Sequence, residues 1–274
     1  MHHLPSLLTD EALTLRGIRD ADLPDLARQL NAPDVARWLA AVSVPFDAAE
    51  LQAHDRHPGE SVRVIALDGQ AIGGLCLGSS LWYWLSPDHW GQGHMGRALR
   101  LALRSWFQKP VPPLTATCHV DNAASRALLT QLGFALSPEG RRMFFHHTRR
   151  SEPCRDYLMA PEQWHLLHPL ELQTATARLR PARQRDLPAL VQLLPCAGDD
   201  IWPTADTLSD FVETHRFRGA QAGLFVIVDH NRRTVGMALH RPGSPAVRFS
   251  TEGDAERHLA GVTQCLTGLA NLAL

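Results

Sequence analysis

The sequence has little of several residue types on which common chemistries depend. Lys109 is the only lysine among 27 basic residues, which leaves almost no candidate for a Schiff-base lysine. The five cysteines include no CxxC pair and the fifteen histidines no HExxH spacing, so neither a disulfide framework nor a metal site is predicted. No apolar run reaches about 18 residues, which argues against a membrane-spanning helix. A formal net charge of -1 argues against a nucleic-acid or membrane-surface binder. We expect a soluble, cytoplasmic protein.

The composition and an internal repeat predict two domains. The chain has 274 residues, of which 45% are apolar and 20% charged, enough for two globular cores. Residues 15–26 resemble residues 179–190, and residues 62–77 resemble residues 225–239, with Gly236 where the first copy has Gly73. This spacing is too long for a solenoid repeat and indicates a duplicated domain. The predicted domains are residues 1–165 and 175–274, joined by a linker over 161–175.

The two copies differ in completeness. The first is expected to contain, after residue 80, strands at 81–85 and 114–120, helices at 96–107 and 123–132, and short strands near 134–136 and 156–159. Asn122 is predicted to cap the second of these helices and Gly133 to end it. The second copy has only one further strand, near 246–250, and a helix at about 255–269. We expect this half-sheet to be unable to close a core alone, so that it packs on the first domain or on another subunit, with a homodimer possible.

A glycine-rich turn is the most informative segment of the chain. Gly91, Gly93 and Gly96 lie between an expected strand and an expected helix. Glycines let the backbone approach a phosphate closely, and the helix N-terminus offers free N–H groups. A Rossmann site would need an acidic residue about 20 positions further on, at the end of the next strand, and that strand has none. A Walker A loop would need Gly-Lys-Ser/Thr, which is absent. The turn therefore predicts a pyrophosphate cradle of another kind; the alternative is a strand-to-helix turn that only needs flexible residues.

The segment Tyr83-Trp84-Leu85 followed by residues 86–99 resembles the acetyl-CoA site of the GCN5-related N-acetyltransferases (GNAT), in particular the RimJ/RimL-type ribosomal-protein alanine acetyltransferase branch. Asn122-Ala-Ala-Ser125, followed by Leu132-Gly133-Phe134, is similar to that branch's second motif. The resemblance covers about residues 10–165. It implies an α/β fold with a mixed, mostly antiparallel central sheet flanked by helices, the acyl-CoA N-acyltransferase fold, to which the chain adds a partial second copy.

The resemblance also implies roles for individual residues. The Leu85 main chain would bond pantetheine or the thioester carbonyl, Asn122 would anchor the pantetheine arm, and Ser125 would lie near the sulfur. A fixed amide at the carbonyl would stabilise the tetrahedral oxyanion, and Ser125 would give a hydrogen bond or proton to the leaving thiolate. Alternatively, Ser125 is a small residue on a helix face. The CoA pyrophosphate would be held by backbone amides of Gln92, Gly93, His94, Met95, Gly96 and Arg97.

The sequence departs from the wider superfamily in its acid and base. A tyrosine acid seven residues after the asparagine is replaced by Leu129, and no general base is evident. Deprotonating an α-amine of pKa about 8 at pH 7 costs about 1 kcal/mol, against about 4.6 kcal/mol for lysine. A site without a dedicated base therefore suits an α-amine, with a relay residue possible among Glu139, Asp121, His119 and His146.

The sequence thus predicts acetyl transfer from acetyl-CoA to a primary amine of a peptide, a protein N-terminus or a small molecule. The alternative is a non-catalytic module on the same scaffold that binds acyl-CoA or a protein partner. In the second copy, residues 250–257 contain one glycine and three acids where the cradle should lie. This half is predicted to bind no CoA.

Overall fold

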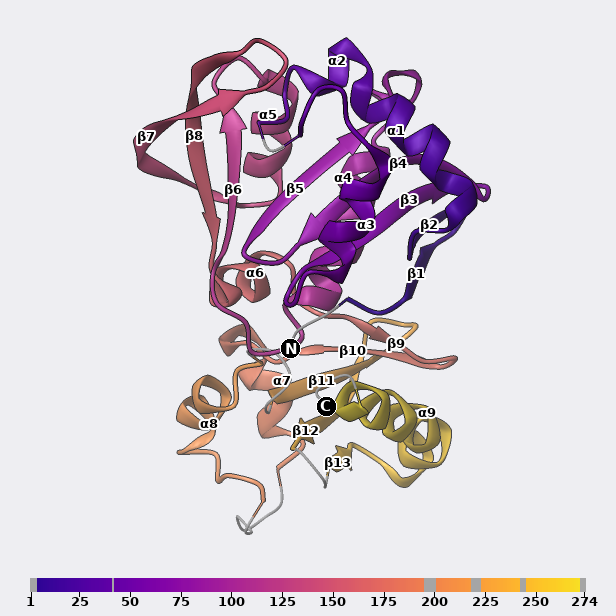
Figure 1. Cartoon of the computed structure of the whole chain (residues 1–274). Coiled ribbons are helices and arrows are strands. Elements are labelled where there is room, and N and C mark those ends of the chain that lie inside the picture. Colours follow the sequence, from indigo (N-terminus) through magenta and orange to yellow (C-terminus); the bar gives the residue numbers. More distant parts are fainter. Residues whose placement is uncertain (1–3, 41, 195–200, 218–222, 242–244, 272–274) are drawn as a thin grey trace. The chain divides into compact units, whose positions relative to one another are not determined.

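The computed structural model describes residues 4–40, 42–194, 201–217, 223–241 and 245–271 (Figure 1). The chain forms two compact units. The first comprises Met1–Trp106 and Val111–Gln163, and the second comprises Phe107–Pro110 and Trp164–Leu274. Within the described ranges, no helix has the length and apolar character needed to cross a membrane.

The first unit is built on an eight-stranded sheet of order β1-β2-β3-β4-β5-β6-β8-β7. Every neighbouring pair is antiparallel except β5 and β6, which are parallel. This mixed, mostly antiparallel sheet confirms the predicted fold class. The strands are β1 (Leu7–Asp10), β2 (Leu13–Arg16), β3 (Ser61–Leu67), β4 (Gln70–Leu77), β5 (Ser80–Leu85), β6 (Leu114–His119), β7 (Ala135–Phe145) and β8 (Arg150–Met159).

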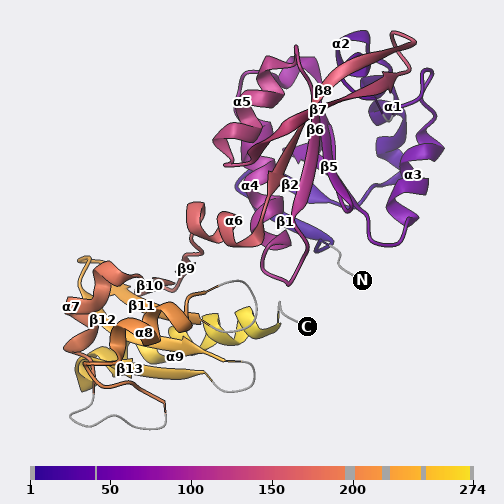
Figure 2. The same cartoon turned by 90° about the vertical axis from the view of Figure 1, so that its left-hand side faces the viewer.

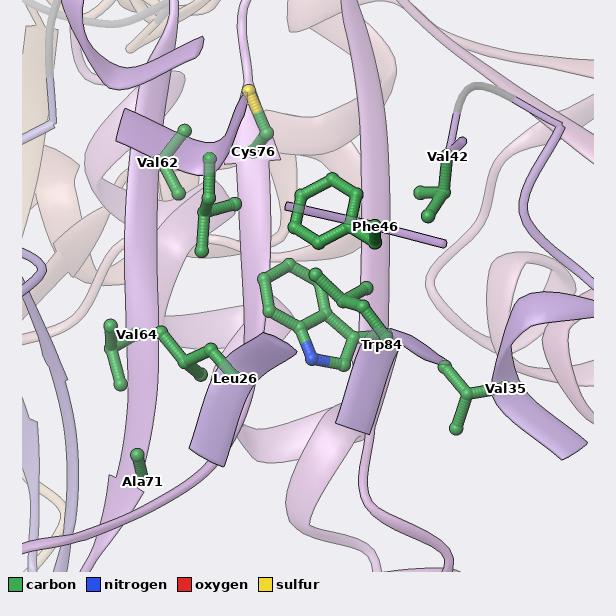
Figure 3. Close-up of a cluster of buried hydrophobic side chains, with 11 residues drawn as sticks. Leu26, Val35, Val42, Phe46, Val62, Val64, Ala71, Cys76 and Trp84 are labelled. Atoms are coloured by element: carbon green, nitrogen blue, oxygen red, sulfur yellow. The ribbon is translucent and has the colours of Figure 1, made fainter. Parts of the chain in front are cut away.

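Helices cover both faces of this sheet (Figure 2). On one face lie α1 (Leu23–Asn31) and α3 (Ala48–Arg56), with the short α2 (Pro33–Ala36) following α1. On the other lie α4 (His94–Trp106) and α5 (Ala123–Gln131). The α1 face encloses a buried cluster to which Leu26, Phe46 and Trp84 contribute (Figure 3).

Helices α4 and α5 begin and end close to their predicted bounds. Leu99, Leu103 and Trp106 form the buried stripe of α4, as their spacing predicts. The Asn122 side chain caps α5 by accepting the Ser125 amide at 3.1 Å. Gly133, with a φ of +88°, ends the helix.

The hairpin of β7 and β8 is much longer than predicted. Residues 137–143 include proline, glycine, glutamate and two arginines, which gives little strand signal. They nevertheless belong to β7, which pairs with β8, and most of them are exposed because β7 is the edge strand of the sheet. The prediction of two short strands here was wrong, since edge pairing does not require an apolar face.

The second unit has its own five-stranded sheet, of order β13-β12-β11-β10-β9, and its own core. Alternate residues of β11 enter two buried clusters, one with α9 and one with α7 and α8. The expectation that this half could not close a core alone is therefore wrong. The elements are β9 (Leu172–Gln173), β10 (Ala177–Pro181), α7 (Leu187–Val191), α8 (Leu208–Thr214), β11 (Gly223–Asp229), β12 (Thr234–His240), β13 (Ala246–Phe249) and α9 (Glu252–Asn271). The predicted linker contains β9, and most of its N-terminal half is helix α6 (Pro161–Leu167).

The second strand of each unit carries the same arginine–aspartate ion pair, and the aspartate is buried in both units. Arg16 at the end of β2 forms two hydrogen bonds with Asp22, at 2.6 and 2.8 Å. Arg180 in β10 does the same with Asp186, at 2.8 and 2.7 Å. In both units the backbone amide three residues before the aspartate also donates to it, at 2.9 Å. The arginine thus ties its strand to the turn that starts the next helix.

The strand register repeats as well. Gly73 pairs with Leu85 on the next strand, and Gly236 pairs with Phe249 in the same relation. A Cβ on either glycine would collide with a carbonyl oxygen of that neighbouring strand, so both positions require glycine. These parallels support the predicted duplication, which stays a prediction.

Buried His240 at the end of β12 leads us to expect an acid-sensitive second unit. Its side chain is buried, neither ring nitrogen has a hydrogen-bond partner among the described residues, and burial lowers its pKa. Below about pH 6.5 the unfolded chain takes up a proton that the folded chain resists, so stability falls by at most about 1.4 kcal/mol per pH unit for this group. His240→Phe should reduce the loss of thermal stability between pH 7 and 5, whereas the exposed His57→Phe should not. Equal pH slopes for wild type and His240→Phe would contradict this.

Candidate active site

The first unit opens between its two parallel strands. β5 and β6 pair only at Ser80 with Thr115 and Leu81 with Ala116, and then diverge. The remainder of β5, including Leu85, pairs with β4 alone. The divergence leaves a wedge in the sheet beside the C-terminal half of β5.

The main chain of Leu85 faces this wedge. Ser86 donates its amide to Ile72 on β4 at 2.8 Å. In an antiparallel ladder, successive residues direct their N–H and C=O groups alternately toward and away from a given neighbour. Leu85 therefore directs its own groups away from β4. Its carbonyl accepts the Trp90 indole N–H at 2.8 Å, which fixes the chain as it leaves the strand.

A cavity of about 470 Å³ occupies the wedge. Tyr83, Trp84 and Leu85 of β5 line it, together with residues of α4 and α5 on one side of the sheet and Val35 and Leu39 of the α1-face cluster on the other. A lining from both sides of the sheet means that the cavity passes through it where β6 has diverged. Among the described residues, no aspartate or glutamate lines it. Its other lining residues are Val35, Trp38, Leu39, His89, Trp90, Gly91, Gly93, His94, Met95, Gly96, Arg100, Asn122, Ala124, Ser125, Ala127, Leu128 and Gln131.

The glycine-rich turn forms one end of the cavity. Gly91 and Gly93 have φ values of +73° and +79°, and no atom lies within 4 Å of where a Cβ would be. The turn therefore presents bare backbone, and α4 begins directly after it at His94. The first amides of a helix have no intrahelical acceptor, so they are free to hold an anion. The amide of Arg97 differs, because it donates to the Gly93 carbonyl at 3.1 Å.

The side chains of the predicted cradle form hydrogen bonds with residues outside the turn and leave its main chain uncovered. Gln92 donates to the Asp88 carbonyl at 2.9 Å and lies 3.2 Å from the His94 ring nitrogen. The Arg97 guanidinium binds Asp10 at 2.9 Å, beside the turn between β1 and β2. Met95 lines the cavity. The predicted residues are thus brought together at one turn, where their main chain is the group offered to a ligand.

Ser125 and Asn122 lie on the α5 side of the wedge, and Ser125 has a partner that sequence reasoning missed. The Tyr83 hydroxyl lies 2.8 Å from the Ser125 hydroxyl, within hydrogen-bonding distance. Burial raises the pKa of Tyr83, so this phenol stays protonated and available as a donor. In the sequence, Tyr83 is part of the motif that resembles the family's strand. Only the alternation of β5, which turns Tyr83 toward α5, could have indicated the contact.

None of the predicted relay residues lines the cavity. Glu139 and His146 are exposed on the β7–β8 hairpin, and Asp121 is exposed after β6. His119 is buried with both ring nitrogens engaged, Nδ1 accepting the Asp121 amide at 3.0 Å and Nε2 lying 3.2 Å from Glu152. Leu129, at the position where the wider superfamily has tyrosine, is buried in the core.

The second unit has no counterpart of the glycine turn among its described residues. Ser250 donates its amide to Val235 at 2.9 Å, as Ser86 does to Ile72. Helix α9 then begins at Glu252, without the intervening turn that precedes α4. Asp254 accepts hydrogen bonds from the Ser250 and Thr251 hydroxyls at the start of this helix. The helix terminus is therefore occupied by the chain's own carboxylate.

A sheet that opens between parallel strands, with a bare glycine turn and a helix start at one end of the opening, defines an acyl-CoA N-acyltransferase fold. Residues 12–135 match the family model described as acetyltransferase (GNAT) domain. This part of the first unit is therefore similar to the acetyltransferase domains of the GNAT family.

Three solved structures of acetyltransferases are similar to part of this chain. A T. thermophilus protein described as an acetyltransferase is 21% identical, with a TM-score of 0.50 over 60% of this chain and 94% of its own. Mycobacterium smegmatis RimJ, in complex with a CoA disulfide, is 22% identical, with a TM-score of 0.48 over 57% and 86%. The ribosomal-protein N-acetyltransferase RimL, in complex with coenzyme A, is 19% identical, with a TM-score of 0.46 over 56% and 97%. No curated protein sequence matches the chain. In the part of the chain described, no three His, Cys, Asp or Glu side chains gather as a metal site would require.

Proposed function

We propose that the protein transfers the acetyl group of acetyl-CoA to a primary amine, an α-amine of a peptide, protein or small molecule, by direct attack in a ternary complex. The observation that carries this proposal is the continuous cavity that joins the glycine turn to Tyr83, Leu85 and Ser125 through the open sheet. A cofactor held at the turn would extend its pantetheine arm along β5 into the wedge.

The cradle binds the pyrophosphate through main-chain amides. The residues from Gln92 to Gly96 supply these amides at the positive end of the α4 dipole. Asn122, whose Oδ1 caps α5, places its amide group beside the arm. Leu85 offers its N–H to the thioester carbonyl from the strand edge that β6 has left.

In the reaction, a C–N bond replaces the C–S bond at the carbonyl carbon. The neutral amine attacks, a C–N bond forms, and the charge that develops on the carbonyl oxygen is stabilised by the fixed Leu85 amide. The C–S bond then breaks, the amine loses a proton to water, and the CoA thiolate takes up one proton. Ser125, with Tyr83 donating to its oxygen, donates a hydrogen bond to the sulfur; if its hydroxyl proton passes to the thiolate, water returns a proton to Ser125.

The absence of a carboxylate from the described cavity lining favours an α-amine over a lysine side chain. No carboxylate among the described lining residues would draw a proton from an amine of pKa about 10.4, whereas an α-amine near 8 is partly neutral at pH 7. Water in the cavity is then sufficient as the proton acceptor.

A non-catalytic acyl-CoA-binding module is the second candidate. It is favoured by Leu129 at the tyrosine position and by the lack of an acidic residue in the described lining. For the second unit we propose, with residues 1–165 and 175–274 as the domains, a truncated copy that binds no CoA, because α9 starts where the glycine turn would be.

Turnover separates the two candidates. We expect free thiol to be released from acetyl-CoA in the presence of α-amines such as amino-acid amides, at a rate well above the amine-free hydrolysis rate, with a mass increase of one acetyl group on the amine. Saturable binding of acetyl-CoA without thiol release from any amine in the panel would instead establish the binding module.

A further inference from the structure

The end of the cavity opposite the glycine turn has a distinct lining. Val35, Trp38 and Leu39 line it from α2 and the residues that follow, and Trp84 lines it from β5. We refer to these four residues as the α2 end. Trp84 belongs to the buried cluster on the α1 face (Figure 3), so the α2 end lies on the other side of the sheet from α4 and α5.

The two ends also differ in charge. Arg100 lines the cavity on the side of the glycine turn, where an anionic cofactor would be held. The α2 end has two indoles and two aliphatic side chains and no charged one. A positive charge contacts it, since the Arg37 guanidinium carbon lies 4.5 Å from the centre of the Trp38 ring.

The rigidity of the α2 end comes from its contacts. Trp38 meets the His119 ring edge-on at 5.6 Å between centroids. Trp84 is stacked on Trp82 at 5.6 Å, and its indole N–H donates to Gln29 at 3.2 Å. Both indoles are thus held in place by the surrounding structure, and Trp38, which is only partly buried, is the one with surface left for a ligand.

We infer that the α2 end binds the acceptor, and that the acceptor is an α-amine whose adjacent side chain is a large apolar or aromatic group. The inference rests on the proposed function, because a cofactor entering from the turn leaves only this end for the amine. Apolar side chains gain from burial against an indole, whereas polyamines and aminoglycosides would bring several positive charges to a cavity whose described lining has no carboxylate, next to Arg37. Such polycations are not the substrates.

Acceptor competition tests this directly. With acetyl-CoA saturating, kcat/KM for phenylalaninamide and leucinamide should exceed that for glycinamide by at least about tenfold, the discrimination that an apolar pocket provides. Spermidine and an aminoglycoside should be turned over no faster than background. Equal rates across the amides, or a preference for the polycations, would overturn the inference.

Variants at the α2 end should change the acceptor and spare the cofactor. Trp38→Ala should raise KM for phenylalaninamide about tenfold or more, with KM for acetyl-CoA unchanged. Leu39→Asp should lower the preference for phenylalaninamide and admit spermidine, because it adds the missing carboxylate. Leu136→Ala is the matched control, since Leu136 is 54% exposed on β7 and does not line the cavity. An equal loss in Leu136→Ala and Trp38→Ala would contradict the assignment.

A binding measurement distinguishes failure of this inference from failure of the proposed function. Calorimetric titration of the CoA-loaded protein with phenylalaninamide, and with glycinamide, measures the affinity of the α2 end for each acceptor without turnover. Selective binding of phenylalaninamide, lost in Trp38→Ala, would support the site even if no acetyl transfer occurs, in which case only the proposed function fails. No binding and no turnover would overturn both.

Discussion

Gly93→Asp is expected to abolish acetyl-CoA binding while leaving the first unit folded. The φ of +79° at Gly93 disfavours any L side chain, but nothing within 4 Å would meet the new Cβ. The dominant effect is charge, since a carboxylate would stand where the pyrophosphate is held. Two unit charges about 4 Å apart near a protein surface repel by about 4 kcal/mol, roughly a thousandfold in affinity.

Thermal unfolding with and without acetyl-CoA measures this effect. A ligand at about 100 times its Kd stabilises the folded state by about 2.7 kcal/mol, which raises the unfolding temperature by a few degrees in a chain of this size. Wild type should show this shift, and Gly93→Asp should show none at millimolar acetyl-CoA.

Gly59→Asp is a matched control. Gly59 has a φ of +87° and equally open surroundings, but it does not line the cavity. It should therefore carry the same backbone strain and keep the acetyl-CoA shift. Gly93→Ala separates strain from charge at the turn itself and should bind with intermediate affinity. A full shift in Gly93→Asp would place the cofactor elsewhere.

The parts of the site that the sequence predicts are those made by short segments. The glycine turn, the start of α4 and the Asn122 cap each depend on a few neighbouring residues with strong backbone preferences. The buried stripe of α4 follows from helical periodicity in the same way. The family resemblance adds the order of these motifs.

The parts that the sequence does not predict depend on which strands become neighbours. The contact between Tyr83 and Ser125 joins residues from β5 and α5, and it exists only because β6 runs parallel to β5 and then diverges. The α2 end brings Trp38 to a cavity formed by later segments. The core of the second unit was missed for a similar reason, since α7, α8 and α9 cover a sheet that the sequence alone presented as half of a larger one.

Ser125→Ala is expected to lower kcat by about a hundredfold, with KM for acetyl-CoA changed by only a few fold, because the hydroxyl acts on the leaving thiolate rather than on bound substrate. Tyr83→Phe should lower kcat by about tenfold or less, the effect of removing one hydrogen bond that orients the serine. On this proposal Tyr83 is a positioning residue that acts through Ser125, whose hydroxyl it contacts.

The double variant Tyr83→Phe, Ser125→Ala measures the coupling between these two residues. If Tyr83 acts through Ser125, adding Tyr83→Phe to Ser125→Ala should cost little more than Ser125→Ala alone. The raised pKa of Tyr83 also predicts that no ionisation of this phenol appears in the kcat profile up to about pH 10, the ordinary tyrosine pKa. Tyr157→Phe, which removes the hydroxyl of the chain's other tyrosine outside the cavity lining, should leave kcat unchanged. Additive losses from Tyr83→Phe and Ser125→Ala would mean that Tyr83 contacts the reacting atoms itself, and the proton path to the thiolate would then run through the phenol.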